Sequence, residues 1–133
     1  MPVYFESAVQ PSQQDLADLE KIYADAPSWL LAPYKDAAEL ISAGLSSNSL
    51  VTGRFNGRLL GAALLEKQAE RWLLSHLCVR ELTRKRGVAR RILEEATRLA
   101  SAAGTVLEVS IPQDQPALRQ LAQDKSLIIA ATT

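Results

Sequence analysis

The chain has little that would cross-link it or direct it to a membrane. Its 133 residues include a single cysteine, Cys78, so no internal disulfide can form, which fits a reducing compartment. Residues 1–6 carry no basic cluster and no long apolar run, so we expect no signal peptide. No stretch approaches the roughly 20 apolar residues that a membrane-spanning helix needs. We therefore expect a cytoplasmic protein with no membrane partner.

Charge of either sign is not in excess. Lys plus Arg and Asp plus Glu each total 15, which gives a formal net charge of zero. No overall field then steers the protein toward nucleic acid, and we expect none as a partner. The hydrophobic fraction of 47% and the charged fraction of 23% are ordinary for a globular chain. The length allows one core, so we expect a single domain over 1–133 that is a monomer on its own.

The apolar periodicity predicts an α/β domain. We expect strands over 3–9, 50–55, 58–67, 71–79, 105–111 and 127–131, and helices that start after Ser12 and over 34–43, 87–102 and 116–123. Asn56-Gly57 between two apolar runs predicts a tight hairpin, because both residues tolerate the positive φ of a type I′ turn. Gly44 and Gly104 are expected to end the helices before them. This order predicts a mixed sheet with helices on both faces.

One passage carries the chemistry, because a strand, a short loop and a long helix follow one another from Val79 to Arg91. The first N–H groups of a helix have no partner inside it and lie at its positive end, where a phosphate can bind. Gly87 lets the backbone approach a ligand closely. The basic residues just before it oppose the helix dipole, and a bound polyanion would relieve that conflict. The alternative is that these basic residues form an ordinary solvent-exposed surface that binds no ligand.

The motif Arg84-x-x-Gly87-x-Ala89 resembles the Q/R-x-x-G-x-G/A signature of the GCN5-related N-acetyltransferases. The resemblance implies a GNAT-like fold that holds the pyrophosphate of acetyl-CoA over this loop and the start of the helix. The pantetheine would pair like a strand with the backbone of the preceding strand, and a splay between that strand and residues 105–111 would admit the acetyl arm. The expected cofactor-binding residues are Leu77, Cys78, Val79, Arg84, Lys85, Arg86, Gly87, Val88, Ala89 and Arg90.

Stretches within 14–22, 54–60 and 77–88 are similar to a narrower family, the PanM/PanZ maturation factors of aspartate 1-decarboxylase. The most specific piece is Val-Arg-Glu-x-Thr-Arg-x-Arg-Gly-Val over 79–88. The resemblance implies a regulator loaded with acetyl-CoA that binds the decarboxylase proenzyme of the β-alanine and pantothenate pathway and promotes its self-cleavage. It makes Arg54 and Asn56, at the hairpin tip, candidate partner-binding residues, although Asn56 also suits the turn itself.

Acetyl transfer to an amine would need a general base and an acid for the leaving thiolate. The superfamily often supplies the acid as a Tyr after the fifth strand, yet residues 112–124 contain no Tyr. His76 is a weak candidate base, and its alternation with Leu74 and Cys78 favours packing between sheet and helix instead. Cys78 is a candidate nucleophile, although a buried structural cysteine is commoner. The alternative function is a small N-acetyltransferase acting on an amine or a protein amino group, with no metal.

Overall fold

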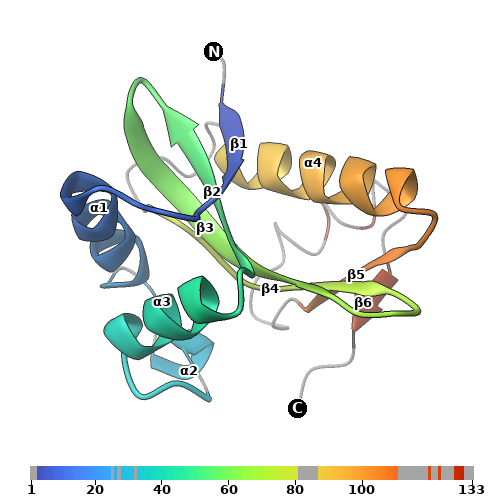
Figure 1. The fold of residues 1–133 in the computed structure, drawn as a ribbon, viewed down its shortest axis with the longest axis horizontal. Coiled ribbons are helices and arrows are strands. Elements are labelled where there is room, and N and C mark those ends of the chain that lie inside the picture. Colours follow the sequence, from blue (N-terminus) through green and yellow to red (C-terminus); the bar gives the residue numbers. More distant parts are fainter. Residues whose placement is uncertain are drawn as a thin grey trace.

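The computed structural model describes residues 3–24, 26, 28–31, 33–80, 87–110, 120, 123 and 128–130. Within these ranges one sheet of six strands separates two helical layers (Figure 1). The strands are β1 (Tyr4–Ser7), β2 (Leu50–Phe55), β3 (Arg58–Lys67), β4 (Trp72–Val79), β5 (Leu107–Ser110) and β6 (Ile128–Ala130). The helices are α1 (Gln13–Ala24), α2 (Ser28–Leu31), α3 (Ala37–Ser46) and α4 (Val88–Ala102).

The strands lie side by side in the order of the sequence. From β1 to β4 they form an antiparallel meander, and β4, β5 and β6 then pair in parallel. Helix α4 connects β4 to β5 and covers one face of the sheet, whereas α1 and α3 cover the other (Figure 1). The predicted mixed, mostly antiparallel sheet with helices on both faces is confirmed.

Each face of the sheet buries its own apolar layer. The α4 layer contains the buried residues Val88, Ile92, Leu93, Ala96 and Ala100, spaced as one stripe of the helix. The opposite layer is built on Leu19, Ile22 and Tyr23 of α1 and Leu40 and Ile41 of α3. Full burial of one such aliphatic side chain contributes about 1.5–3 kcal/mol. The two layers meet only through the sheet, so the sheet sets the position of both helical faces.

The β2–β3 hairpin is as the sequence predicts. Its turn residues Asn56 and Gly57 have φ of 52° and 83°, the left-handed pair that a type I′ turn requires. The predicted start of α1 is confirmed as well, since the hydroxyl of Ser12 accepts a hydrogen bond from the backbone N–H of Asp15 at 3.0 Å. Gly104, with φ of 79°, follows the end of α4 as expected.

The predicted helix over 34–43 is wrong in both of its ends. Helix α3 begins at Ala37 behind the cap residue Asp36, whose carboxylate accepts from the N–H of Glu39, and it continues to Ser46. Gly44 is therefore a buried residue inside the helix rather than its end. A Cβ there would lie 2.8 Å from Leu64 Cδ2. Close packing on β3, which periodicity does not reveal, explains this glycine.

Two further differences concern short elements. Helix α2 is not predicted by the sequence pattern, because four residues are too few to show a period. The expected helix over 116–123 lies outside the described residues except for Gln120 and Gln123, which are helical. The remaining strands begin or end within a few residues of their predicted bounds.

A buried carboxylate joins α1 to the hairpin. Asp18 is only 2% exposed and accepts from Arg58 Nη2 at 2.6 Å, from Arg58 Nε at 3.0 Å and from the backbone N–H of Leu59 at 3.2 Å. The hydrogen bond from Arg58 is the main reason that the pKa of Asp18 lies below its ordinary value of 3.8. Because its partners come from a distant strand, the sequence pattern of α1 did not mark this residue as buried.

Neutralising this carboxylate should remove part of the acid sensitivity of the fold. A carboxylate whose pKa is lowered by folding stabilises the native state above its unfolded pKa, and this contribution is lost as the pH falls through the folded pKa. We expect Asp18→Asn to lower the free energy of unfolding by about 2 kcal/mol near neutral pH and to flatten its decline below about pH 4. Urea titrations across pH measure both effects.

The matched control is Glu20→Gln, an exposed position on the same helix. It should leave stability and its pH dependence close to those of the unmodified protein. If the free energy of unfolding of Asp18→Asn fell at acid pH as much as that of the unmodified protein, the role assigned to this carboxylate would be wrong.

Candidate functional site

The amino end of α4 presents backbone amides without a partner in the helix. The N–H of Arg91 donates to the carbonyl of Gly87 at 3.0 Å, which is the first bond of the helical ladder. The N–H groups of Val88, Ala89 and Arg90 precede that bond, so they have no acceptor inside the helix. They mark the positive end of a helix of fifteen residues.

In helices α1 and α3, a side-chain oxygen at the cap position accepts a hydrogen bond from a backbone N–H of the first turn. In α1 the cap is Ser12, and in α3 it is Asp36. Helix α4 has Gly87 at the cap position, no side-chain cap bond and no acidic residue in its first turn. Among the described residues, then, nothing offsets the partial positive charge, and an anionic ligand would.

Gly87 is needed for a reason beyond the one that the sequence suggested. Its φ of 82° lies in the left-handed region, which a glycine adopts without steric cost. A Cβ added there would meet no heavy atom within 4 Å among the described residues. At Gly87 itself, then, no described residue stands in the way of the close approach of a ligand that the sequence predicts.

The side chains of this turn divide between the core and the solvent. Val88 is 1% exposed and packs against the sheet, Ala89 packs beside it, and Arg90 is exposed. The backbone amides of this turn, together with the exposed side chain of Arg90, are therefore the groups that can face a ligand. The predicted phosphate-binding residues Arg84, Lys85 and Arg86 lie outside the described residues.

The expected pantetheine segment lies along β4, at the point where its pairing with β5 ends. The parallel register joins Trp72–Leu74 to Leu107–Val109. Among the described residues no pair continues it toward Val79. Side chains of Leu77 and Cys78 enter opposite apolar layers, and Val79 packs on the α4 side.

A bulge in β4 changes which way its side chains point. The β3–β4 register shifts between Ala62 and Leu64, and His76 has a left-handed φ of 55°. As a result Leu74 belongs to the α4 layer and Cys78 to the opposite layer. The predicted alternation of His76 with these two residues is therefore wrong, because the bulge adds a residue to the strand.

His76 faces the helical layer of α1 and α3. Its Nδ1 lies 2.9 Å from the hydroxyl of Ser75, and its ring centroid lies 5.5 Å from that of Tyr34. The hydroxyl of Tyr23, a buried residue of α1, donates to the His76 carbonyl at 2.9 Å. Cys78 is 6% exposed and its thiol donates to the Ile22 carbonyl, which supports a structural thiol rather than a nucleophile.

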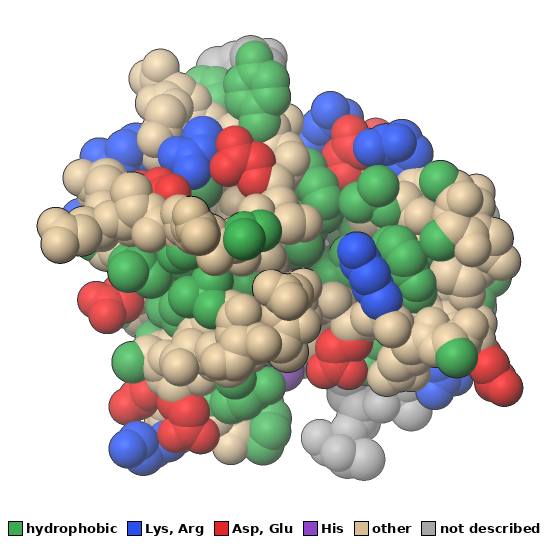
Figure 2. Space-filling view, in the orientation of Figure 1, with side chains coloured by type: hydrophobic (Ala, Val, Ile, Leu, Met, Phe, Trp, Pro, Cys, Tyr) green, Lys and Arg blue, Asp and Glu red, His purple; other side chains and the backbone are tan. Residues whose placement is uncertain are grey.

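The two candidate partner-binding residues have different surroundings. The Arg54 guanidinium contacts both carboxylate oxygens of Glu6 at 3.1 Å, Asp15 Oδ2 at 3.0 Å and the carbonyl of Gly57 at 2.9 Å. These bonds attach the hairpin tip to α1 and β1. Asn56 is exposed at the tip. Figure 2 shows basic and acidic side chains interleaved in this part of the surface.

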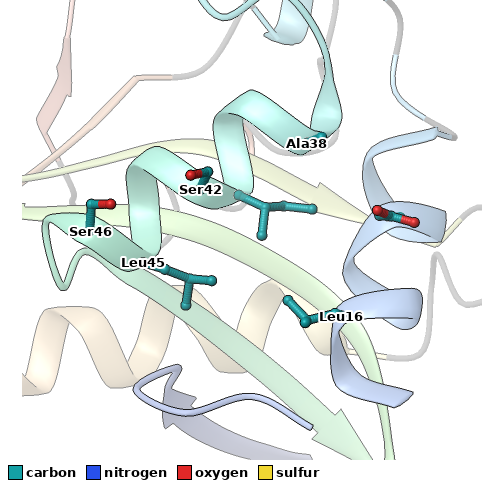
Figure 3. A pocket seen from close by; sticks show the side chains of 7 residues that line it. Leu16, Ala38, Ser42, Leu45 and Ser46 are labelled. Atoms are coloured by element: carbon teal, nitrogen blue, oxygen red, sulfur yellow. The ribbon is translucent and has the colours of Figure 1, made fainter. Parts of the chain in front are cut away.

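An open groove of about 310 Å³ lies between α1 and α3 (Figure 3). Apolar side chains gather between these helices on the face seen in Figure 2. The residues that line the groove are Leu16, Glu20, Ala38, Ile41, Ser42, Leu45 and Ser46. They belong to the layer opposite α4, so this groove is separate from the amide site.

Two kinds of feature are not found in the described part of the chain. It contains no group of three or more His, Cys, Asp or Glu side chains placed to bind a metal ion. Its helices are also too short or too polar to cross a membrane.

Comparison with known families decides what kind of domain this is. The family described as acetyltransferase (GNAT) domain, PanZ, matches residues 2–120. The chain belongs to this family. Membership confirms the resemblance noted in the sequence.

The similar curated proteins are both named PanD regulatory factor. That of Escherichia coli (strain K12) is 35% identical over 88 residues, which cover 65% of this chain and 60% of that protein. That of Salmonella typhimurium (strain LT2) is 34% identical over 87 residues, with the same coverage. The chain thus matches less than two thirds of the length of either relative.

Solved structures show the same fold at low sequence identity. PH1933 from Pyrococcus horikoshii OT3 has a TM-score of 0.78 at 11% identity, with 99% of this chain and 92% of that chain covered. The PaiA N-acetyltransferase from Thermoplasma acidophilum, in complex with coenzyme A, has a TM-score of 0.67 at 14% identity, with 93% and 89% covered. These likenesses establish the GNAT fold of this family member.

Sequence reasoning missed the tyrosines around the β4 bulge. The sequence marks Tyr23 and Tyr34 only by their places in predicted helices, Tyr23 in the one after Ser12 and Tyr34 at the start of the one over 34–43. A signal for Tyr23 was present, because a tyrosine at a buried helical position needs a partner for its hydroxyl. The partner itself, a carbonyl 53 residues along the chain, depends on the bulge and is not predictable from α1.

The Tyr23 hydroxyl should therefore contribute to the stability of the bulge. We expect Tyr23→Phe to lower the free energy of unfolding by about 1 kcal/mol, since it removes one buried hydrogen bond while keeping the ring. Denaturant unfolding gives the value, and the amide resonances of β4 report whether the bulge changes. Equal stability together with unchanged β4 resonances would contradict this role.

Proposed function

We propose that this protein is an acetyl-CoA-binding regulator of aspartate 1-decarboxylase that promotes self-cleavage of the decarboxylase proenzyme. One observation carries the proposal: a chain of the PanZ family has the amino end of α4 uncapped, behind a left-handed glycine. The names of the two bacterial relatives support the regulatory role. The coenzyme A complex of a structural neighbour supports the ligand class.

The diphosphate of acetyl-CoA would accept hydrogen bonds from the amides of Val88, Ala89 and Arg90. Bonds from neutral donors to a charged acceptor contribute about 1.5–3 kcal/mol each. The exposed guanidinium of Arg90 adds positive charge at the rim. The pantetheine would lie along the backbone of β4 over 77–79, beyond the described residue pairs of β4 with β5.

The decarboxylase would bind at the tip of the β2–β3 hairpin. Asn56 presents its side chain there from a rigid two-residue turn. Arg54 stabilises the same turn through the hydrogen bond that its guanidinium donates to the Gly57 carbonyl. We therefore assign contact with the decarboxylase to Asn56 and assign to Arg54 the role of holding the tip.

The direct test is binding to a decarboxylase proenzyme with and without acetyl-CoA. We expect a complex that forms only with the cofactor and faster proenzyme cleavage in its presence. Asn56→Asp, which keeps the tendency for left-handed backbone, should weaken the complex without loss of cofactor binding. Lack of any cofactor-dependent complex would reject the decarboxylase as the partner.

A charge pair at Gly87 tests the cofactor site. Asp and Asn are almost equal in size, and both tolerate a left-handed backbone. We expect Gly87→Asp to bind acetyl-CoA at least tenfold more weakly than Gly87→Asn, because like charges a few Å apart near a protein surface repel by roughly 1–4 kcal/mol. Isothermal titration calorimetry measures the two affinities.

The unmodified protein provides the reference for this pair. It should gain about 2.7 kcal/mol of stability when acetyl-CoA exceeds its Kd a hundredfold. Equal affinities for the Asp and Asn variants would place the diphosphate elsewhere.

A second candidate function is acetyl transfer to an amine, and the hydrogen bond between Ser75 and His76 favours it. A histidine fixed by a neighbouring hydroxyl beside the β4 edge is suited to proton transfer. Release of free coenzyme A with a panel of amines and amino-terminal peptides separates the two functions. Turnover that disappears in His76→Gln would replace the regulator with an N-acetyltransferase, whereas the regulator shows none.

A further inference from the structure

Two glycines face each other across the β2–β3 hairpin beneath the first turn of α4. Gly53 and Gly61 are register partners and both are buried. A Cβ at Gly61 would lie 2.7 Å from Val88 Cγ1, and one at Gly53 would lie 3.0 Å from the same atom. The side chain of Val88 therefore occupies the space that the two missing side chains leave.

Space, not backbone conformation, explains these glycines. Neither has the positive φ that distinguishes Gly57, Gly87 and Gly104, so another residue could adopt the same backbone. Glycine inside a strand weakens the strand and often indicates close approach of another segment. Here the segment that approaches is α4, since Ile92 Cδ1 is also within 3.5 Å of both Cβ positions.

The contact lies at the functional end of the helix. Val88 is the first residue of α4, and its N–H is the first of the three amides without an acceptor in the helix. The far end of α4 packs through Ala96 and Ala100, away from the two glycines. A methyl group added to the hairpin would therefore lift the first turn more than the last and tilt the amide end away from the sheet.

We propose that the Gly53–Gly61 pair is a positioning element for the cofactor site: it sets the height of the α4 amide end and thereby the affinity for the thioester nucleotide. The inference rests on the proposed binding of acetyl-CoA at this end. The pantetheine edge of β4 and the diphosphate amides of α4 belong to one ligand, so a tilt of α4 would misalign them. Binding sites lose affinity when their supporting groups move by about 1 Å.

The test is a graded pair of substitutions with acetyl-CoA affinity as the readout. We expect Gly61→Ala to weaken binding about tenfold, the equivalent of one lost charge-assisted hydrogen bond. Gly53→Ala, with the looser contact, should weaken binding less. The amide resonances of Val88, Ala89 and Arg90 in the ligand-free protein should shift in the same order.

Gly44→Ala is the matched control. Its added Cβ would be as crowded, at 2.8 Å from Leu64 Cδ2 and 3.1 Å from Leu50 Cβ, but it lies in the layer opposite α4. It should lower the melting temperature as Gly61→Ala does and leave the Kd for acetyl-CoA unchanged. This separates positioning of the site from general loss of stability.

A compensating variant supplies the rescue. In Gly61→Ala/Val88→Ala the new methyl group replaces the branch removed from Val88, so the helix can return to its original height. We expect the double variant to regain most of the affinity lost in Gly61→Ala. If Gly61→Ala does not fold, Gly53→Ala paired with Val88→Ala gives the same comparison.

The outcomes distinguish this inference from the proposed function. Binding by the unmodified protein, with equal affinity in the Gly61→Ala and Gly53→Ala variants, would overturn the inference and leave the function intact. A loss of affinity in Gly44→Ala as large as that in Gly61→Ala would overturn it too. No binding by the unmodified protein would reject the proposed cofactor, and unshifted α4 amides in the glycine variants would then reject the positioning role independently.

Discussion

The contact between the first turn of α4 and the β2–β3 hairpin determines where the candidate site lies. Val88 reaches the sheet because Gly53 and Gly61 have no side chains there. The same hairpin is attached on its other face to α1, where Asp18 is buried against Arg58 and the Leu59 amide. One hairpin thus supports both helical layers, by apolar close packing on one face and by the ion pair of the buried Asp18 with the half-exposed Arg58 on the other.

The contacts between the hairpin and α1 bring together two of the stretches on which the sequence resemblance rests. The stretches 14–22 and 54–60 resemble the family in sequence, and in the fold they meet through the pairs Asp15–Arg54 and Asp18–Arg58. Because these four side chains pair with one another within the chain, their role in the fold is enough to explain their presence. Within the second stretch, Asn56 is exposed and makes the turn, which is why partner recognition is assigned to it and not to the arginine beside it.

Features that depend on local conformation could be predicted from the sequence, and those that depend on distant partners could not. The Asn56–Gly57 turn requires left-handed backbone at two adjacent residues, which the residue types themselves indicate. Gly87 was predicted at the start of α4, whereas its left-handed φ was not. The burial of Asp18 depends on a strand forty residues away. Glycine is typical of a helix end, yet at position 44 it is explained by close packing against Leu64 on β3. The predicted cofactor residues 84–86 lie outside the described ranges, so the site is defined here by its helical half.

The bulge in β4 limits how a strand-like ligand can pair with this edge. A left-handed backbone at a histidine costs of order 1–3 kcal/mol, and it persists when surrounding contacts hold it. Here the hydroxyl of Tyr23 engages the His76 carbonyl from α1. The Tyr23 hydroxyl takes one lone pair of that carbonyl, and the left-handed backbone at His76 interrupts the regular spacing of acceptors along this strand. Val79 at the end of this strand and Val88 at the start of α4 both pack against Gly61, so the proposed sites for the pantetheine and the diphosphate lie next to each other.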